Sequence, residues 1–305
     1  WTSLDLDQED AITIYHQLSM STGLNELVFE CTDPICLTYR ADAGDRWAYH
    51  NGPYSLLRKV LETAYNQDLN TITASELKSK IGMKGFWVRS GFNNFYVSRA
   101  RDMARFGLMI QANGSWDGDT ILSDQQYYDE MLNSSQELNP SYGYLWWLNG
   151  KTSFIGPNSP TSIAGPTTPN GPEDLITAAG AQGQFISISK SEGLVLVRQG
   201  RADVNDLAPL NHLKEIWSQV LELECTITST DTEVKNIKIS PQPAHDYIEV
   251  LNTDLSNVEI TDVLGRPLRV YSNRNIFKIS TLKPGIYVLS GYIGSKPFRK
   301  RFYKQ

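Results

Sequence analysis

The chain has 305 residues, enough for one large domain and one small one. Its 40% hydrophobic and 20% charged residues are typical of folded protein and exclude a mainly disordered chain. No segment approaches the roughly 20 apolar residues that a membrane-spanning helix needs. The chain opens on Trp1 and an acidic stretch instead of a signal peptide. We therefore expect a cytoplasmic protein, or a piece whose beginning is absent.

The net charge of −6 is unevenly distributed. Residues 237–305 hold 11 Lys and Arg against 5 Asp and Glu, a charge of +6, whereas the preceding residues hold 17 against 29, a charge of −12. This break predicts two domains, 1–224 and 237–305, joined by a linker over 225–236 that is rich in Thr and Ser. The basic charges are scattered along the second domain, so we expect no nucleic-acid partner.

In the first domain, apolar periodicity and end signals predict a series of helices. They cover residues 11–18, 54–64, 72–81, 99–111 (with Ser98 as N-cap), 125–132 and 209–223. Strands are predicted over 142–148, 184–189 and 194–198, the last two joined by a hairpin turn at 190–193. A turn at 114–119 and long loops over 33–45 and 156–172 complete the pattern. Strands interspersed with helices indicate a sheet that is covered on its faces.

The second domain contains only short strands separated by Pro- and Gly-containing turns. The predicted strands cover residues 246–251, 258–263, 276–279, 285–291 and 298–303. About 70 residues with this spacing predict a small β-sandwich.

Cysteines and histidines exclude several kinds of site. The four histidines have no metal-ligand spacing, and no Gly-x-Ser-x-Gly elbow, phosphate-binding loop or Cys-x-x-Cys occurs. We therefore expect no metal and no cofactor. Cys31 and Cys36 are close enough to form a disulfide in an oxidising compartment, but two free thiols fit the sequence equally well.

The residues with the most suggestive chemistry are Tyr49 and Asn51, just ahead of the predicted helix 54–64. A phenol can shuttle a proton and an amide can hold a substrate carbonyl. Alone, this spacing also fits a buried tyrosine and a turn asparagine. His50 lies between them and should point away, in a structural role.

Several short motifs occur along the chain in an order and at spacings that match those of a known family. They are LSMSTGL (18–24), RWAYHNGPYSLL (46–57), Gly82-Met83, SRARDMARFGL (98–108), YGYLWWL (142–148) and GAQGQFISI (180–188). Together they resemble the serine β-lactamase-like hydrolases, which include class C β-lactamases, D-alanyl-D-alanine peptidases and related esterases and amide hydrolases. The resemblance covers most of residues 10–222. It implies an α/β (α+β) fold, with helices packed on an antiparallel sheet.

The resemblance also implies roles in acyl transfer. Tyr49 would assist proton transfer and Asn51 would bind the substrate carbonyl. Gln182 and Gly183 would line the other wall, and the Gln184 N–H would bind the oxyanion. Ala181 stands where the family often has Lys or His, which favours a neutral ester or amide over a β-lactam. On a strand, one of Trp146 and Trp147 must face outward, so we take Trp146 as a cleft-wall candidate.

The family's nucleophile, the Ser of Ser-x-x-Lys, is the main departure. The pattern occurs at Ser75/Lys78, Ser187/Lys190 and Ser280/Lys283, all downstream of Tyr49, whereas the family places it upstream. We expect the nucleophile segment to be absent from this chain, which is then N-terminally incomplete and inactive alone.

The last 70 residues resemble the C-terminal sorting domain of type IX secretion. The matching segments are PQPA (241–244), ITDVLGRPL (260–268), ISTLKPGIYVL (279–289) and FRKRFYK (298–304). This resemblance implies a secreted or outer-surface protein that engages the type IX machinery. An adhesive or carbohydrate-binding sandwich is the alternative.

Together these patterns predict a secreted serine hydrolase that cleaves an ester or amide bond of a small ester, amide or peptide through an acyl-enzyme. Two alternatives stay open. One is a non-catalytic surface protein that keeps the fold for binding. The other is the same chemistry on a different substrate, in a peptidase or a true β-lactamase.

Overall fold

The computed structural model describes residues 1–28, 31–157, 159–201, 209–222, 237–241, 243–251, 255–262, 265–294 and 296–305. The chain divides into two compact units, Trp1–Glu224 and Cys225–Gln305. The predicted linker 225–236 lies entirely outside the described residues. None of the described helices is long and apolar enough to cross a bilayer.

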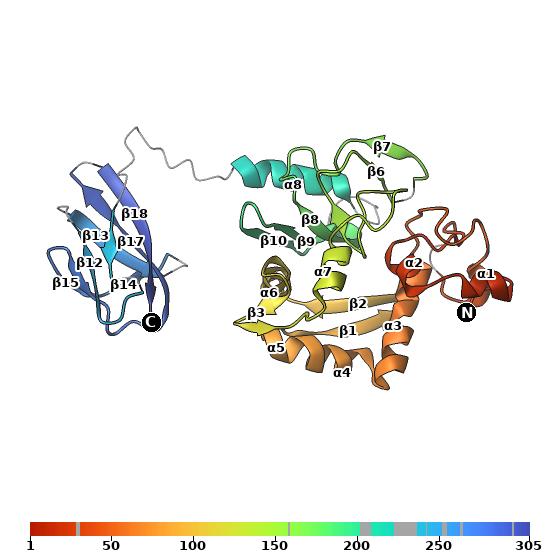
Figure 1. The fold of residues 1–305 in the computed structure, drawn as a ribbon, viewed down its shortest axis with the longest axis horizontal. Helices are drawn as coiled ribbons and strands as arrows, with labels where there is room; N and C mark the ends of the chain where they lie inside the picture. The colour runs from red at the N-terminus through yellow and green to blue at the C-terminus, as the bar shows by residue number, and fades with distance from the viewer. Residues whose placement is uncertain are drawn as a thin grey trace. The chain divides into compact units, whose positions relative to one another are not determined.

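The first unit is built around an antiparallel sheet of four strands in the order β10-β9-β8-β5 (Figure 1). The strands are β5 (Trp147–Leu148), β8 (Ile176–Gly180), β9 (Gln184–Ser189) and β10 (Leu194–Arg198). Strands β9 and β10 have the predicted bounds, because their alternating apolar residues and the turn between them are local signals. Strand β8 was not predicted.

Helices cover both faces of this sheet, as the sequence predicted (Figure 1). Phe185 of β9 packs in one core cluster with Trp217 of α8 (Leu210–Glu222), while Ile186 packs in another with Met109 of α6 (Ala100–Gln111). The approach of α6 is close, since a Cβ on Gly107 would lie 2.5 Å from Val195 Cγ1. The mixed helical and antiparallel fold class is therefore confirmed.

Helices α3 to α5 and a β-hairpin form a second group in this unit. Helix α3 (Asn51–Tyr65) is followed by α4 (Leu69–Thr73), a π-helical turn (Ala74–Lys78) and α5 (Ser79–Ile81), which reproduce the predicted helix 72–81. The antiparallel hairpin of β1 (Gly85–Ser90) and β2 (Asn93–Ser98) was missed, because Phe86, Trp87 and Val88 are consecutive apolar residues without alternation. Ser98 therefore ends a strand, and the helix that follows has Arg99 as its N-cap.

Other predicted boundaries also shift. The helix predicted over 11–18 is shorter, α2 (Ile14–Leu18), capped by Thr13; a separate helix ahead of it, α1 (Leu6–Asp10), was not predicted. The turn at 114–119 contains a hairpin of β3 (Ser115–Trp116) and β4 (Asp119–Thr120), and the long loop 156–172 includes β7 (Ser162–Ala164), which pairs with β6 (Ser153–Ile155). Helix α7 (Gln125–Met131) agrees with the prediction. The short pairings were missed because strands of two or three residues carry no readable period.

The second unit is a β-sandwich of two four-stranded antiparallel sheets, ordered β11-β12-β16-β15 and β14-β13-β17-β18. A common core joins them, with Ile248 and Phe277 from one sheet and Leu289 and Phe302 from the other. The strands are β11 (Ile239–Ser240), β12 (Tyr247–Val250), β13 (Leu255–Asp262), β14 (Pro267–Leu268), β15 (Tyr271–Asn273), β16 (Ile276–Lys278), β17 (Gly285–Ile293) and β18 (Lys296–Lys304).

Candidate active site

Asn51 is the first residue of α3, so it lies on the helix and not in the loop ahead of it as predicted. His50 is the N-cap, with extended φ −135° and ψ 111°, and Tyr49 precedes it. The helix begins before its apolar period because Pro53 falls in the first turn, where backbone N–H groups have no intrahelical acceptor. The Asn51 amide is thus held on a rigid element.

The ring of Tyr49 lies in an aromatic cluster. It stacks on Trp147 at 6.1 Å between centroids and 17° between planes, and it meets Tyr142 edge-on at 6.4 Å. Trp47 contacts both Tyr142 and Trp147, which closes the group. Such contacts fix the position and tilt of the Tyr49 ring.

The first turn of α3 holds several buried polar atoms. The Asn51 side chain is only 6% exposed, and its Oδ1 has no hydrogen-bond partner in the part of the chain that the structure describes. Ser55 Oγ, one turn farther along α3, and the Trp47 indole N–H, ahead of the helix, are also buried without a described partner. A buried acceptor without a donor is costly in a folded protein, so this turn suits a ligand or segment that brings donors.

His50 lies beside these atoms with 1% of its surface exposed. Burial lowers the pKa of its imidazole from 6.5 to about 4; the negative charge of Glu26 raises this pKa by a smaller amount, and the positive charge of Arg46 lowers it further. His50 is therefore neutral at pH 7. This fits the structural role expected from the sequence.

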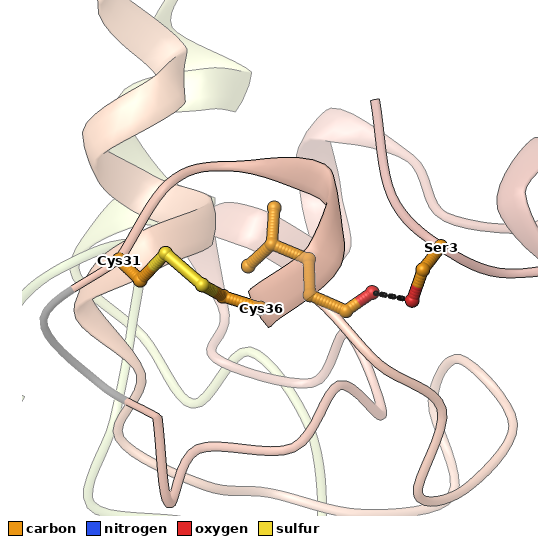
Figure 2. The surroundings of a disulfide bond; sticks show 4 residues. Ser3, Cys31 and Cys36 are labelled. Carbon is orange, nitrogen blue, oxygen red and sulfur yellow. Dashed lines mark hydrogen bonds between the residues drawn. A yellow bond between two sulfur atoms is a disulfide. The ribbon is translucent and has the colours of Figure 1, made fainter.

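A disulfide-closed loop packs on the same turn. Cys31 and Cys36 are bonded, which decides between the two alternatives left by the sequence (Figure 2). A Cβ on Gly52 would lie 2.6 Å from the Cys31 carbonyl oxygen and 3.0 Å from Leu37 Cδ2. The Leu37 carbonyl in turn accepts a hydrogen bond from the Ser3 hydroxyl (Figure 2). Only glycine allows the helix and this loop to approach so closely.

Gln182 and Gly183 lie in the turn between β8 and β9, and Gln184 is the first residue of β9. Residues Ala181–Gly183 form the turn, and Gly180 pairs with Gln184 across it. Gln182 and Gly183 have φ of 60° and 80°. The left-handed φ suits glycine at position 183, which is buried, while Gln182 before it is exposed.

The turn and Tyr49 contribute to the same region. Ala179, next to the end of β8, and Phe185, at the start of β9, pack with Tyr49 in one core cluster. Trp147, on which Tyr49 stacks, pairs with Thr177 of β8. The turn begins about 10 Å farther along that strand, at ~3.3 Å per residue. The structure thus brings together two stretches that lie about 130 residues apart in sequence.

Arg198 was missed by sequence reasoning, which had noted only the absence of a cation at Ala181. It is the last residue of β10, and its Nη1 donates to the carbonyl of Gly183 at 2.7 Å. Extending the predicted hairpin register would have found it, because that register places Arg198 opposite Phe185. The turn therefore does have a positive charge beside it.

Trp146 does not face outward. It is 5% exposed, stacks on Phe106 and packs in the cluster under α6, whereas Trp147 is 2% exposed and packs with Tyr49. The expectation that one of the pair points outward is wrong because the strand has only two residues, and Leu145 ahead of it has a left-handed φ of 62°.

The three Ser-x-x-Lys serines lie in other surroundings. The Ser75 hydroxyl donates to carbonyls of its own helix, at 3.1 Å from Ile72 O. The Ser187 hydroxyl is fully buried and bonded to Thr177 and Trp217. Ser280 belongs to the second unit. Among the described residues, no group of three or more His, Cys, Asp or Glu side chains is placed to hold a metal ion.

No family model and no curated protein matches the chain, but solved structures do. One is a protein from Bacillus anthracis provisionally assigned as a 6-aminohexanoate-dimer hydrolase, with TM-score 0.51 and 17% identity over 69% of this chain and 60% of that one. This chain thus spans less than two thirds of that protein.

Two further structures are as similar. A β-lactamase from Mycobacterium bovis has TM-score 0.51 and 18% identity over 70% of this chain and 74% of its own. A protein from Bacteroides dorei provisionally assigned as a β-lactamase has TM-score 0.51 and 15% identity over 71% and 73%. The chain therefore has the fold of the serine β-lactamase-like hydrolases.

Proposed function

We propose that this chain is the greater part of a secreted serine hydrolase that cleaves an ester or amide bond through an acyl-enzyme, with the nucleophilic serine on a segment outside the chain. The observation that carries the proposal is that Tyr49, two residues before Asn51, packs in one aromatic cluster with Ala179 and Phe185, which flank the β8–β9 turn. The shared fold supports it.

Each group has a distinct task in this mechanism. The serine hydroxyl attacks the substrate carbonyl, and Tyr49 relays its proton to the leaving group. The Asn51 amide holds the substrate by hydrogen bonding, while its unpartnered Oδ1 can accept from a donor on the nucleophile segment. The Gln184 N–H stabilises the oxyanion that forms when the carbonyl is attacked.

We also propose that residues 237–305 direct export through the type IX machinery. The motifs in this unit and its sandwich architecture support this role. The Cys31–Cys36 disulfide adds support, because disulfides persist mainly in oxidising compartments outside the cytosol. Fusing residues 225–305 to a periplasmic reporter in a type IX-competent bacterium should place the reporter on the cell surface. Retention in the periplasm would contradict the role.

Hydrolysis is tested by expressing the chain together with the coding sequence upstream of Trp1. Turnover is measured on a short-chain nitrophenyl ester, a chromogenic β-lactam and a D-amino-acid peptide. We expect turnover of at least one of them. Tyr49→Phe should lower kcat about 10²–10⁴-fold with little change in melting temperature, because the ring and its stacking are kept. The isolated chain should be inactive, and Tyr49-dependent turnover by it would contradict the proposed location of the nucleophile.

A non-catalytic binding protein with the same fold is the second candidate. It is favoured by the environments of Ser75 and Ser187, whose hydroxyls are engaged in helix and core hydrogen bonds. An upstream coding sequence without Ser-x-x-Lys, together with no turnover of any substrate, would establish it over the enzyme.

A further inference from the structure

We infer that Arg198 is a positioning residue, which fixes the peptide between Gly183 and Gln184. This inference rests on the proposed function only in taking the Gln184 N–H as the oxyanion donor. Arg198 ends β10 and pairs with Phe185 of β9, so its side chain starts one strand away from the turn. Its guanidinium reaches the Gly183 carbonyl at 2.7 Å.

The geometry of the peptide bond makes this contact consequential. The C=O of Gly183 and the N–H of Gln184 belong to one planar unit, in which they point in opposite directions. A donor that holds the carbonyl therefore also sets the direction of the N–H. A charged donor draws electrons toward the carbonyl oxygen, which makes the N–H a stronger donor to an oxyanion. Gly183 has a left-handed φ of 80°, and without the brace such a turn has other conformations open to it.

The same guanidinium ties the turn to the segment that follows β10. Arg198 also donates to the carbonyl of Gly200 at 3.2 Å and to that of Arg201 at 3.3 Å. The side-chain amide of Gln184 makes two hydrogen bonds to the backbone of Gly200: its Oε1 accepts from the Gly200 N–H at 3.1 Å, and its Nε2 donates to the Gly200 carbonyl. Both side chains thus fix the turn to one neighbouring stretch of backbone.

All of these partners are neutral main-chain carbonyls. Within the described ranges, no carboxylate lies within ion-pair distance of Arg198, whereas Arg46 and Arg58 are paired with glutamates. The positive charge beside the turn is therefore not neutralised by a described partner. In a site partly shielded from water such a charge acts more strongly than it would in solvent.

The test observes the backbone N–H of Gln184 directly by NMR and needs no catalysis. In the 305-residue chain we expect this N–H to have an order parameter of about 0.85, typical of rigid backbone, which falls below about 0.6 in Arg198→Ala. Millimolar guanidinium should restore it by filling the vacated position, and Arg198→Lys should retain part of the rigidity. The matched control is Arg89→Ala, because Arg89 also donates to a main-chain carbonyl, that of Gly91, but on the β1–β2 hairpin. It should leave Gln184 unchanged.

An unchanged Gln184 amide in folded Arg198→Ala, or no response to guanidinium, would overturn the inference. If that variant does not fold, the test uses NMR of the Arg198 side chain in the unmodified chain. The hydrogen-bonded Nη protons of Arg198 should then exchange slowly with water, and a freely rotating guanidinium would overturn the inference.

A second measurement separates this inference from the proposed function. Where the upstream segment gives hydrolysis, Arg198→Ala should lower kcat about 10–100-fold with KM little changed, less than the 10²–10³-fold loss on removing an oxyanion donor. If Arg198→Ala makes the Gln184 backbone N–H mobile but the chain with its upstream segment hydrolyses no substrate, the proposed function is contradicted and the role of Arg198 stands. If that protein hydrolyses a substrate but Arg198→Ala leaves the Gln184 N–H rigid, the proposed function stands and the role of Arg198 is contradicted.

Discussion

Replacing Gly52 with alanine tests how tightly the disulfide loop holds the turn that carries Asn51. Position 52 is helical, so alanine by itself should stabilise α3 by about 1 kcal/mol. The new Cβ, however, would lie 2.6 Å from the Cys31 carbonyl oxygen, 3.0 Å from Leu37 Cδ2 and 3.2 Å from His50 Nε2. A backbone carbonyl beside a disulfide and a fully buried Leu37 cannot move aside cheaply.

Overpacking of this kind costs about 1–3 kcal/mol, at least as much as the helical gain. We expect a net loss of up to about 2 kcal/mol and a fall in melting temperature of up to roughly 8 °C. Tryptophan fluorescence is the appropriate assay, because all seven tryptophans lie in the first unit. Gly156→Ala is the matched control, since a Cβ there meets nothing within 4 Å. It should be neutral or slightly stabilising.

The loop itself supplies the second arm of this experiment. In a Cys31→Ser/Cys36→Ser background the carbonyl of residue 31 can move, so the additional cost of Gly52→Ala should shrink. Equal stability of Gly52→Ala and Gly156→Ala in the disulfide-bonded protein would refute the close packing of α3 on this loop.

Two further predictions concern stability. Because the pKa of His50 falls from 6.5 to about 4 on folding, the unfolded chain binds a proton below pH 6.5 that the folded one does not. Stability should therefore decline by up to about 3 kcal/mol between pH 6.5 and 4; a His50→Gln variant with an identical decline in urea titrations would contradict this. Asn149 is 6% exposed and bonds the backbone of Thr168 at 2.8 and 2.9 Å and the Pro172 carbonyl at 2.8 Å. Asn149→Ala should cost about 3 kcal/mol by leaving these buried groups unpaired; a loss below about 1 kcal/mol in urea denaturation would show that water replaces the amide.

Local sequence signals were sufficient for several elements of the first unit. The bounds of β9 and β10, and those of α8 to within a residue, follow from the side-chain period and from turn residues, which act over a few positions. Tyr49 and Asn51 were identified in the same way, by a spacing supported by flanking motifs. The start of α3 at Asn51 was missed because the apolar period begins only at Tyr54.

The rest depended on contacts between distant residues. The burial of both Trp146 and Trp147 follows from one left-handed residue, Leu145, and from two separate core clusters. A period-2 pattern assumes regular backbone and cannot anticipate such a residue. The disulfide likewise depended on where the fold places the two sulfur atoms.

The amino-acid sequence by itself determined the class of fold, the principal helices and strands, and the chemical character of Tyr49 and Asn51. Those features depend on residue type and on spacing over one or two turns. Only the tertiary structure decided that Tyr49 stacks on Trp147, that Gly52 lies under the disulfide loop and that Arg198 braces the β8–β9 turn. Each of these contacts joins residues that are neighbours in space but not in sequence, and no local pattern specifies which of them meet.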